Sequence, residues 1–196
     1  MKARLSESVA NELAFYNFDG TAILAPRGWT CDGSSGSGGA TVKVYDPRVG
    51  LFPNPTGDGY QPRIAVTGWV TSSGTNHPLF LACPWFTNAA AVLKTEGLDC
   101  GYPGDLSPIG EQQTRVSNYE FSFRDQAGAH GTADPSGGPN PSGGFILWYP
   151  HTDDKIGQDA AATATCELPE RDAAMCATIL ADFRARFHDE VGPLYP

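Results

Sequence analysis

Hydrophobic and polar residues alternate along much of this chain with the period of two that is typical of half-buried β-strands. In the segment 115–123, Tyr119, Phe121 and Phe123 are expected to face the core, and Glu120 to face solvent. The run 145–149 is apolar throughout, which is typical of a central strand that is covered on both faces. Strand patterns cover five segments: residues 21–25, 40–45, 63–71, 115–123 and 145–149.

Helical periods occur in fewer places. Residues 84–95 are predicted to form a short helix that Pro84 opens and Gly97 ends. Residues 169–188 form the clearest helix, because Pro169 suits its first turn and the apolar side chains recur along one face. These side chains are Met175, Ile179, Phe183 and Phe187. A further short helix is predicted over residues 6–16.

Glycine and proline separate these elements, with 23 and 16 copies in 196 residues, so long loops are expected. The Gly/Ser stretch over residues 32–39 is predicted to join strands 21–25 and 40–45 as a hairpin loop, and residues 46–62 to form an irregular loop. Because strands and helices do not alternate as in βαβ units, we expect an α+β fold with a mainly antiparallel sheet. The expected organisation is an N-terminal segment over 1–19, a single domain over 20–190 and a tail over 191–196.

The five cysteines predict disulfide bonds. None of them has the Cys-x-x-Cys spacing of zinc or redox motifs. Five cysteines can form two bridges in fifteen ways, and local pairing favours Cys83–Cys100 and Cys166–Cys176, with Cys31 unpaired. Disulfides persist in oxidising compartments, so this pattern favours an extracytoplasmic protein.

The charge balance limits the possible partners. Lys and Arg number 13 against 22 Asp and Glu, which gives a net charge of −9. A chain this acidic repels the phosphate backbone of nucleic acids and anionic membrane surfaces. No apolar run approaches the roughly 18 residues of a membrane span, so no transmembrane segment is expected.

The first residues bear on the predicted location. Residues 1–5 are basic enough to begin a signal peptide, but Ser6, Glu7 and Ser8 stand where its apolar region belongs. We therefore expect an extracytoplasmic or secreted protein whose leader is not part of this chain. A cytoplasmic protein with free thiols is the alternative.

Motifs of known catalytic chemistry are missing from the sequence. Neither the Gly-x-Ser-x-Gly turn of serine hydrolases nor the His-Glu-x-x-His pair of zinc proteases occurs. The remaining candidates are His130, Asp134 and His151, on two loops that flank the 145–149 strand. If these imidazole and carboxylate groups converge, they suit a divalent metal ion or a general base.

Four short stretches carry a resemblance to a known group of proteins. They are residues 24–31 (LAPRGWTC), 82–86 (ACPWF), 130–139 (HGTADPSGGP) and 166–169 (CELP). In these stretches the chain resembles a group of exported, actinobacterial-type proteins of uncharacterised function. The resemblance implies secretion or a lipoprotein anchor. It implies no activity, no catalytic residues and no cofactor.

The sequence therefore favours a non-catalytic extracytoplasmic domain that binds a ligand or associates with the cell envelope. Its partner is expected to be a small molecule or another protein, and no cofactor is expected. Two alternatives remain: a hydrolytic enzyme that uses the His130, Asp134 and His151 loops, with or without a metal, and a module whose acidic face binds a basic protein.

Overall fold

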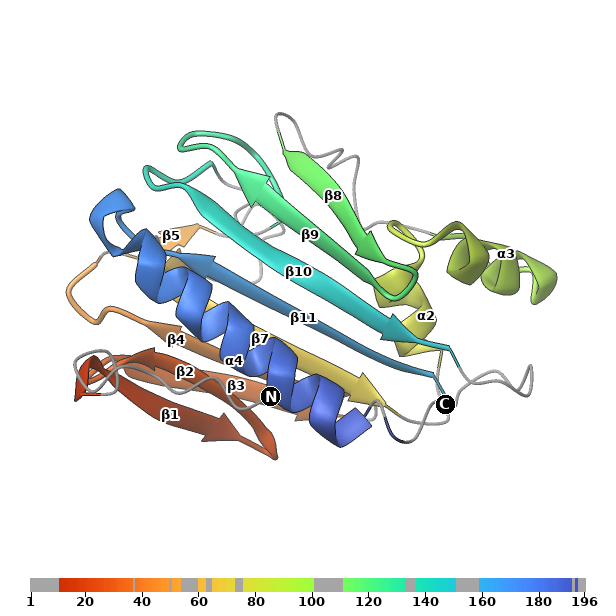
Figure 1. Ribbon diagram of the computed structural model, residues 1–196, viewed down its shortest axis with the longest axis horizontal. Helices are drawn as coiled ribbons and strands as arrows, with labels where there is room; N and C mark the ends of the chain where they lie inside the picture. The colour runs from red at the N-terminus through yellow and green to blue at the C-terminus, as the bar shows by residue number, and fades with distance from the viewer. Residues whose placement is uncertain are drawn as a thin grey trace.

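A seven-stranded antiparallel sheet forms the middle of the protein (Figure 1). The computed structural model describes residues 11–36, 38–49, 51–53, 60–62, 65–72, 76–100, 111–132, 137–150, 159–191 and 193. Across the sheet the strands are β3 (Thr30–Gly36), β4 (Gly39–Tyr45), β7 (Ala65–Ser72), β11 (Ala160–Glu167), β10 (Ser142–Tyr149), β9 (Glu120–Asp125) and β8 (Gln112–Ser117). All neighbouring strands run antiparallel. The α+β prediction is confirmed.

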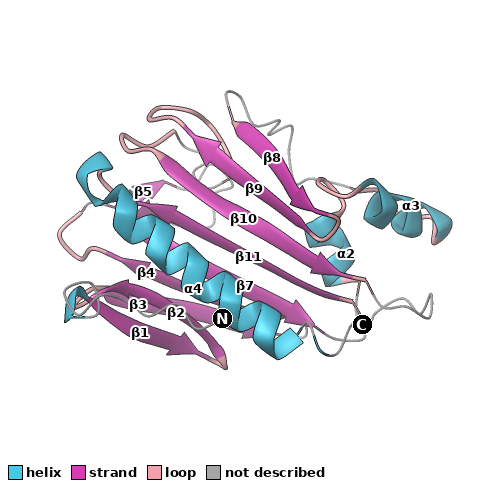
Figure 2. Ribbon diagram, viewed as in Figure 1, coloured by secondary structure: helices cyan, strands magenta, loops and turns pink. Residues whose placement is uncertain are grey.

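Each face of the sheet carries its own layer (Figure 2). The helix α4 (Ala173–Val191) and the hairpin of β1 (Leu13–Phe18) and β2 (Thr21–Pro26) pack on one face. The helices α2 (His77–Ala82) and α3 (Thr87–Thr95) pack on the other. The short strands β5 (Leu51–Pro53) and β6 (Tyr60–Pro62) pair with each other, and the 3-10 turn η1 (Glu170–Asp172) precedes α4.

The side chains of β10 enter both hydrophobic cores, which explains the continuous apolar run at residues 145–149. Its side chains alternate, so that Phe145, Leu147 and Tyr149 join the core beneath α4, whereas Ile146 and Trp148 join the core beneath α2 and α3. Every one of them is buried. Because both faces of β10 are covered, the strand needs apolar side chains at consecutive positions.

Glycines let the layer of α4 and the β1–β2 hairpin approach the sheet closely. A Cβ atom on Gly68 of β7 would stand 2.7 Å from the Phe183 ring of α4 and 3.2 Å from the Ile23 side chain of β2. A Cβ atom on Gly33 of β3 would stand 2.0 Å from the ring of Phe18. The helix and the hairpin therefore pack directly against bare backbone at these two positions.

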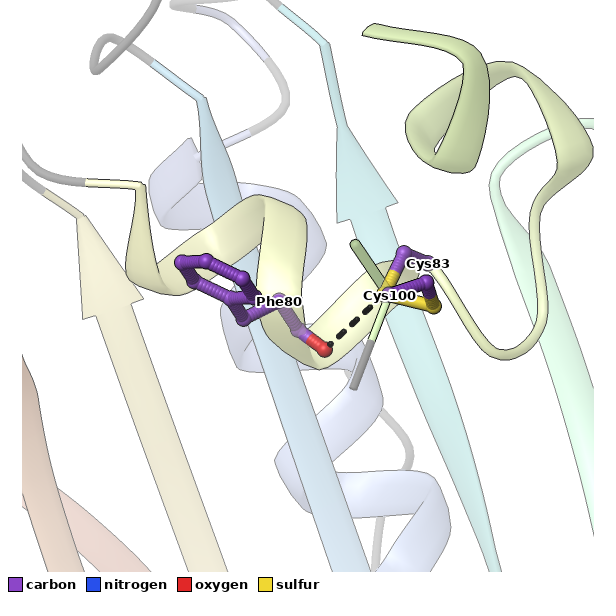
Figure 3. The surroundings of a disulfide bond; sticks show 3 residues. All are labelled: Phe80, Cys83 and Cys100. Atoms are coloured by element: carbon purple, nitrogen blue, oxygen red, sulfur yellow. Dashed lines mark hydrogen bonds between the residues drawn. A yellow bond between two sulfur atoms is a disulfide. The ribbon is translucent and has the colours of Figure 1, made fainter. Parts of the chain in front are cut away.

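Both predicted disulfides are confirmed. The Cα atoms of Cys83 and Cys100 are 5.8 Å apart, and those of Cys166 and Cys176 are 5.6 Å apart. The first bond joins the end of α2 to the chain beyond α3 (Figure 3). The carbonyl oxygen of Phe80 lies 3.5 Å from the Cys83 sulfur. Because this sulfur is part of the disulfide and carries no proton, the contact is polar but is not a hydrogen bond. Cys31, on β3, carries a free thiol.

Most predicted strands are confirmed. The segments 21–25, 40–45 and 145–149 correspond to β2, β4 and β10, and the described part of 63–71 corresponds to β7. The predicted C-terminal helix is confirmed as α4, with Ile179, Phe183 and Phe187 buried.

Other predictions are wrong. The helix predicted over 6–16 is wrong from Leu13 onward, where the backbone pairs with β2 as the strand β1; residues 11 and 12 are helical, and residues 6–10 lie outside the described residues. Residues 32–39 do not connect β2 to β4; residues 30–36 form β3, which pairs with β4. The predicted loop over 46–62 contains β5 and β6.

Two further segments also depart from the sequence analysis. The predicted helix over 84–95 is α3 alone, since Pro84 lies in the turn that separates it from α2. The predicted strand over 115–123 is two strands with a turn at residues 118–119. This turn exposes Tyr119 and buries Glu120, which reverses the predicted orientation of both.

The close contact at Gly68 predicts a specific sensitivity. We expect Gly68→Ala to lower the free energy of unfolding by about 1–3 kcal/mol, because the added methyl group overlaps the Phe183 ring. Urea unfolding measures this change. The control is Gly36→Ala in β3, where no atom lies within 4 Å of an added Cβ; a loss equal to that of Gly68→Ala would contradict the packing argument.

The disulfide pattern predicts the thiol count. Alkylation of the unfolded protein without reductant is expected to label one cysteine, Cys31, and alkylation after reduction to label five. Mass spectrometry of the labelled peptides measures both numbers. Five labelled cysteines without reductant would instead support the cytoplasmic alternative.

Candidate functional site

The predicted catalytic loops are only partly described. His130 is exposed beside the end of β9, whereas Asp134 and His151 lie outside the described residues. Nearby, the Ser142 hydroxyl donates a hydrogen bond to the buried Asp125 carboxylate at 3.2 Å. Within the described ranges, no group of three or more His, Cys, Asp and Glu side chains is placed to hold a metal ion. The predicted site at His130, Asp134 and His151 therefore stays a prediction.

A cavity of about 310 Å³ opens at the other end of the molecule, and we call it the hairpin cavity. Its walls come from residues 19–22 at the β1–β2 turn, residues 36, 39 and 40 around the β3–β4 turn, Val70 of β7, and residues 183, 186, 187, 190 and 191 of α4. Figure 1 shows the β1–β2 turn and the C-terminal end of α4 at the same end of the sheet. Segments far apart in the sequence thus form one hollow.

The β1–β2 turn follows directly from its sequence. Phe18 pairs with Thr21, so that Asp19 and Gly20 alone make the turn. Their φ angles are 48° and 83°, both in the left-handed region. Asp-Gly is a favoured dipeptide for such a two-residue hairpin turn, because glycine has no Cβ to clash and aspartate tolerates this region better than most residues. Asp19 and Gly20 are both among the residues that line the cavity.

Arg186 fixes the helix wall to the hairpin wall. Its Nη2 atom donates to the carbonyl oxygen of Ala22 at 2.9 Å, and its Nε atom donates to the Asp182 carboxylate at 2.9 Å. The guanidinium carbon also lies 5.2 Å from the centre of the Phe15 ring and 5.6 Å from that of Phe183. The positive charge of Arg186 is therefore already engaged within the protein.

The rest of the lining combines apolar surface with two carboxylates. Phe183 and Phe187 form part of the apolar wall. Asp19 and Glu190 contribute the carboxylates, one from the hairpin and one from the helix. Thr21 is 6% exposed, and its hydroxyl donates to the Ala40 carbonyl at 3.5 Å, the outer limit of a hydrogen bond.

A second polar group lies on the opposite flank of α4, and we call it the helix-flank cluster: Glu120, Tyr149, Arg184 and His188. The Glu120 carboxylate is 2% exposed and lies 2.7 Å from Arg184 Nη2. The Tyr149 hydroxyl is hydrogen-bonded to His188 Nδ1. The Tyr119 ring stacks on Tyr149 with 5.8 Å between ring centres. These contacts hold the C-terminal half of α4 against β9 and β10.

Burial shifts the ionisation of the helix-flank cluster. It raises the pKa of the Glu120 carboxyl, and the Arg184 guanidinium opposes that change. It lowers the pKa of His188, and Arg184 lowers it further while Asp189 opposes. Burial also raises the pKa of Tyr149, with a contribution from Glu120. Such shifted groups gather at functional sites, and they also gather where a polar network holds elements together.

Sequence reasoning missed both sites. The alternation over 115–123 places Glu120 in solvent, because it does not reveal the turn at residues 118–119. His188 lies near the end of a helix, where no motif marks it as part of a site. One pattern points to the cluster: Arg184 and His188 are four residues apart, so they share one flank of the helix beside the apolar stripe of Phe183 and Phe187. For the hairpin cavity, the Asp-Gly dipeptide at residues 19–20 is the feature of the sequence that points to one of its walls, the β1–β2 turn.

No family model matches this sequence, and no curated protein matches it. The two disulfides indicate an oxidising, extracytoplasmic environment. None of the helices within the described residues is long and apolar enough to cross a membrane.

The pKa of His188 predicts a pH dependence of stability. Because its pKa is lowered in the folded protein, the unfolded chain takes up the proton first as the pH falls below about 6.5. The stabilising effect of the neutral ring is thus present above about pH 6.5 and is lost on acidification. Glu120 acts in the opposite direction, because its raised pKa favours protonation of the folded state.

A histidine variant isolates this contribution. We expect His188→Asn, which keeps a polar atom near the Nδ1 position, to reduce the loss of unfolding free energy between pH 7 and pH 5. Urea unfolding across that range measures the slope. The control is His130→Asn at an exposed position, and an identical slope in wild type and His188→Asn would contradict the assignment.

Proposed function

We propose that this protein is a non-catalytic, exported domain that binds a small molecule in the hairpin cavity. The observation that carries the proposal is the cavity itself, a hollow of about 310 Å³ walled by the β1–β2 turn, the β3–β4 turn and α4. Its volume lies at the lower end of the range of about 300–1,000 Å³ for ligand pockets. A small ligand suits this size.

The fixed walls of the cavity support binding. The Asp19-Gly20 turn sets the hairpin, and Arg186 joins α4 to the Ala22 carbonyl. The Glu120–Arg184 ion pair holds the same helix from its other flank. A site that is already formed loses little conformational entropy when its ligand arrives, so even a small ligand retains useful affinity.

The chemistry of the lining favours binding over catalysis. Among the described residues that line the hairpin cavity there is no Ser, Cys, His or Lys, which leaves Asp19, Glu190 and the Thr21 hydroxyl as its reactive groups. Arg186 is held by Asp182 and Ala22, and the Thr21 hydroxyl is directed to the Ala40 carbonyl. The disulfides support an exported location for this binding domain.

A fragment screen by protein NMR tests the proposed function. We expect bound fragments to shift the amide signals of Gly20, Ala22 and Gly39 together, because these residues come from two walls of one cavity. Ala22→Leu adds three carbon atoms at a residue that lines the cavity and is expected to abolish these shifts.

The matched control is Ala181→Leu, which makes the same change at an exposed position on α4. It is expected to keep fragment binding. Hits that survive Ala22→Leu, a screen with no hits at the cavity, or substrate turnover that a single substitution removes would each contradict the proposed function.

A further inference from the structure

We propose that the ligand of the hairpin cavity is a small organic cation with an apolar body, such as an alkyl- or trimethylammonium compound. This inference rests on the proposed binding function and specifies its ligand class. Three properties of the lining carry it: the sign of the available charge, the aromatic wall and the position of the buried hydroxyl.

The available charge in the cavity is negative. Asp19 lines it from the β1–β2 turn and Glu190 from α4, and neither has an ion-pair partner among the described residues. Arg186 is the one cation of the described lining, and its charge is shared with the Asp182 carboxylate. Together these four groups carry three negative charges and one positive charge, a net charge of −2. An anionic ligand is repelled here, whereas a cation is attracted.

The aromatic wall suits the same class of ligand. Phe183 and Phe187 line the cavity one helical turn apart; both residues are buried, at 3% and 4% exposed, and the Arg186 guanidinium carbon lies 5.6 Å from the centre of the Phe183 ring. Ring faces attract cations through their quadrupole, and their carbon surface covers alkyl groups. An ammonium group with methyl or alkyl substituents meets both requirements.

The buried hydroxyl supplies an acceptor. Thr21 donates its proton to the Ala40 carbonyl at 3.5 Å, so the lone pairs of its oxygen remain available for an N–H or O–H group of a ligand. Thr21 lines the cavity and is 6% exposed as a residue, so water has little access to its hydroxyl. Carboxylates, ring faces and a hydroxyl oxygen together form a set of acceptors for a positive group.

A pair of isosteric probes tests the ligand class. Choline and 3,3-dimethyl-1-butanol have the same shape and differ by the exchange of a quaternary nitrogen for carbon. We expect choline to bind about tenfold more tightly, as measured by titration of the Gly20, Ala22 and Gly39 amide signals, and to weaken with added salt. The anionic probe 3,3-dimethylbutanoate is expected to bind more weakly than either.

Variants locate the charge contribution. Asp19→Asn and Glu190→Gln are each expected to weaken choline several-fold and to leave the alcohol unchanged. Asparagine suits the left-handed φ of 48° at position 19, so the turn is retained. The control is Glu96→Gln, an exposed carboxylate outside the cavity, and it is expected to bind both probes as wild type does.

The outcomes separate the two proposals. Equal binding of choline and the alcohol at the cavity, or tighter binding of 3,3-dimethylbutanoate, would overturn the cation proposal and leave the binding function standing. Fragment binding at the cavity with no response to choline would do the same. A cavity that binds none of the three probes and no fragment would overturn both.

Discussion

The contact of α4 with the sheet at Gly68 is the constraint on which the rest of this structure depends. The Phe183 ring of the helix and the Ile23 side chain of the hairpin both occupy space that any Cβ on Gly68 would need. This one glycine therefore lets α4 and the β1–β2 hairpin both pack closely against β7. Phe183 itself lines the hairpin cavity, together with residues of the β1–β2 turn and the last turns of α4.

The helix is held in three different ways along its length. The Cys166–Cys176 disulfide ties its first turn to β11, and apolar packing of Ile179 and Phe183 fixes its middle. Ion pairs and hydrogen bonds fix its last turns. The helix that forms one wall of the cavity therefore depends on interactions that respond to different conditions. The disulfide responds to redox potential, and the polar contacts respond to pH and salt.

The sequence predicts this fold best where a segment has one clear pattern. Apolar runs and regular alternation identify β4, β7 and β10, and sequence-local pairing identifies both disulfides. The prediction fails where a residue type has a weak preference. Residues 30–36 are rich in glycine and serine, yet they form β3 because β4 offers them an edge on which to pair. The strand β11 is rich in alanine, which favours strands little, and its pairing with β7 and β10 makes it a strand.

The candidate sites are harder to predict, because each needs the relative position of distant segments. Glu120 is buried, and its ion-pair partner Arg184 lies 64 residues later in the chain. The cavity combines residues from position 19 to position 191. Local sequence contains the turn at Asp19 and the apolar stripe of α4, but not the distance between them. The close contact of Phe183 and Ile23 with Gly68 is one constraint on that distance, and it cannot be predicted from the sequence around Gly68.

The position of β11 has a consequence for biosynthesis. This strand is the last of the sheet in chain order, yet it lies at its centre, between β7 and β10. The strands β3, β4 and β7 lie on one side of it, and β10, β9 and β8 lie on the other. Until residues 160–167 are in place, the inner edges of β7 and β10 have no strand to pair with. Unpaired edges invite association with other chains. A chain of this topology gains most from remaining unfolded until nearly all of it has emerged, as a polypeptide does while it is threaded across a membrane.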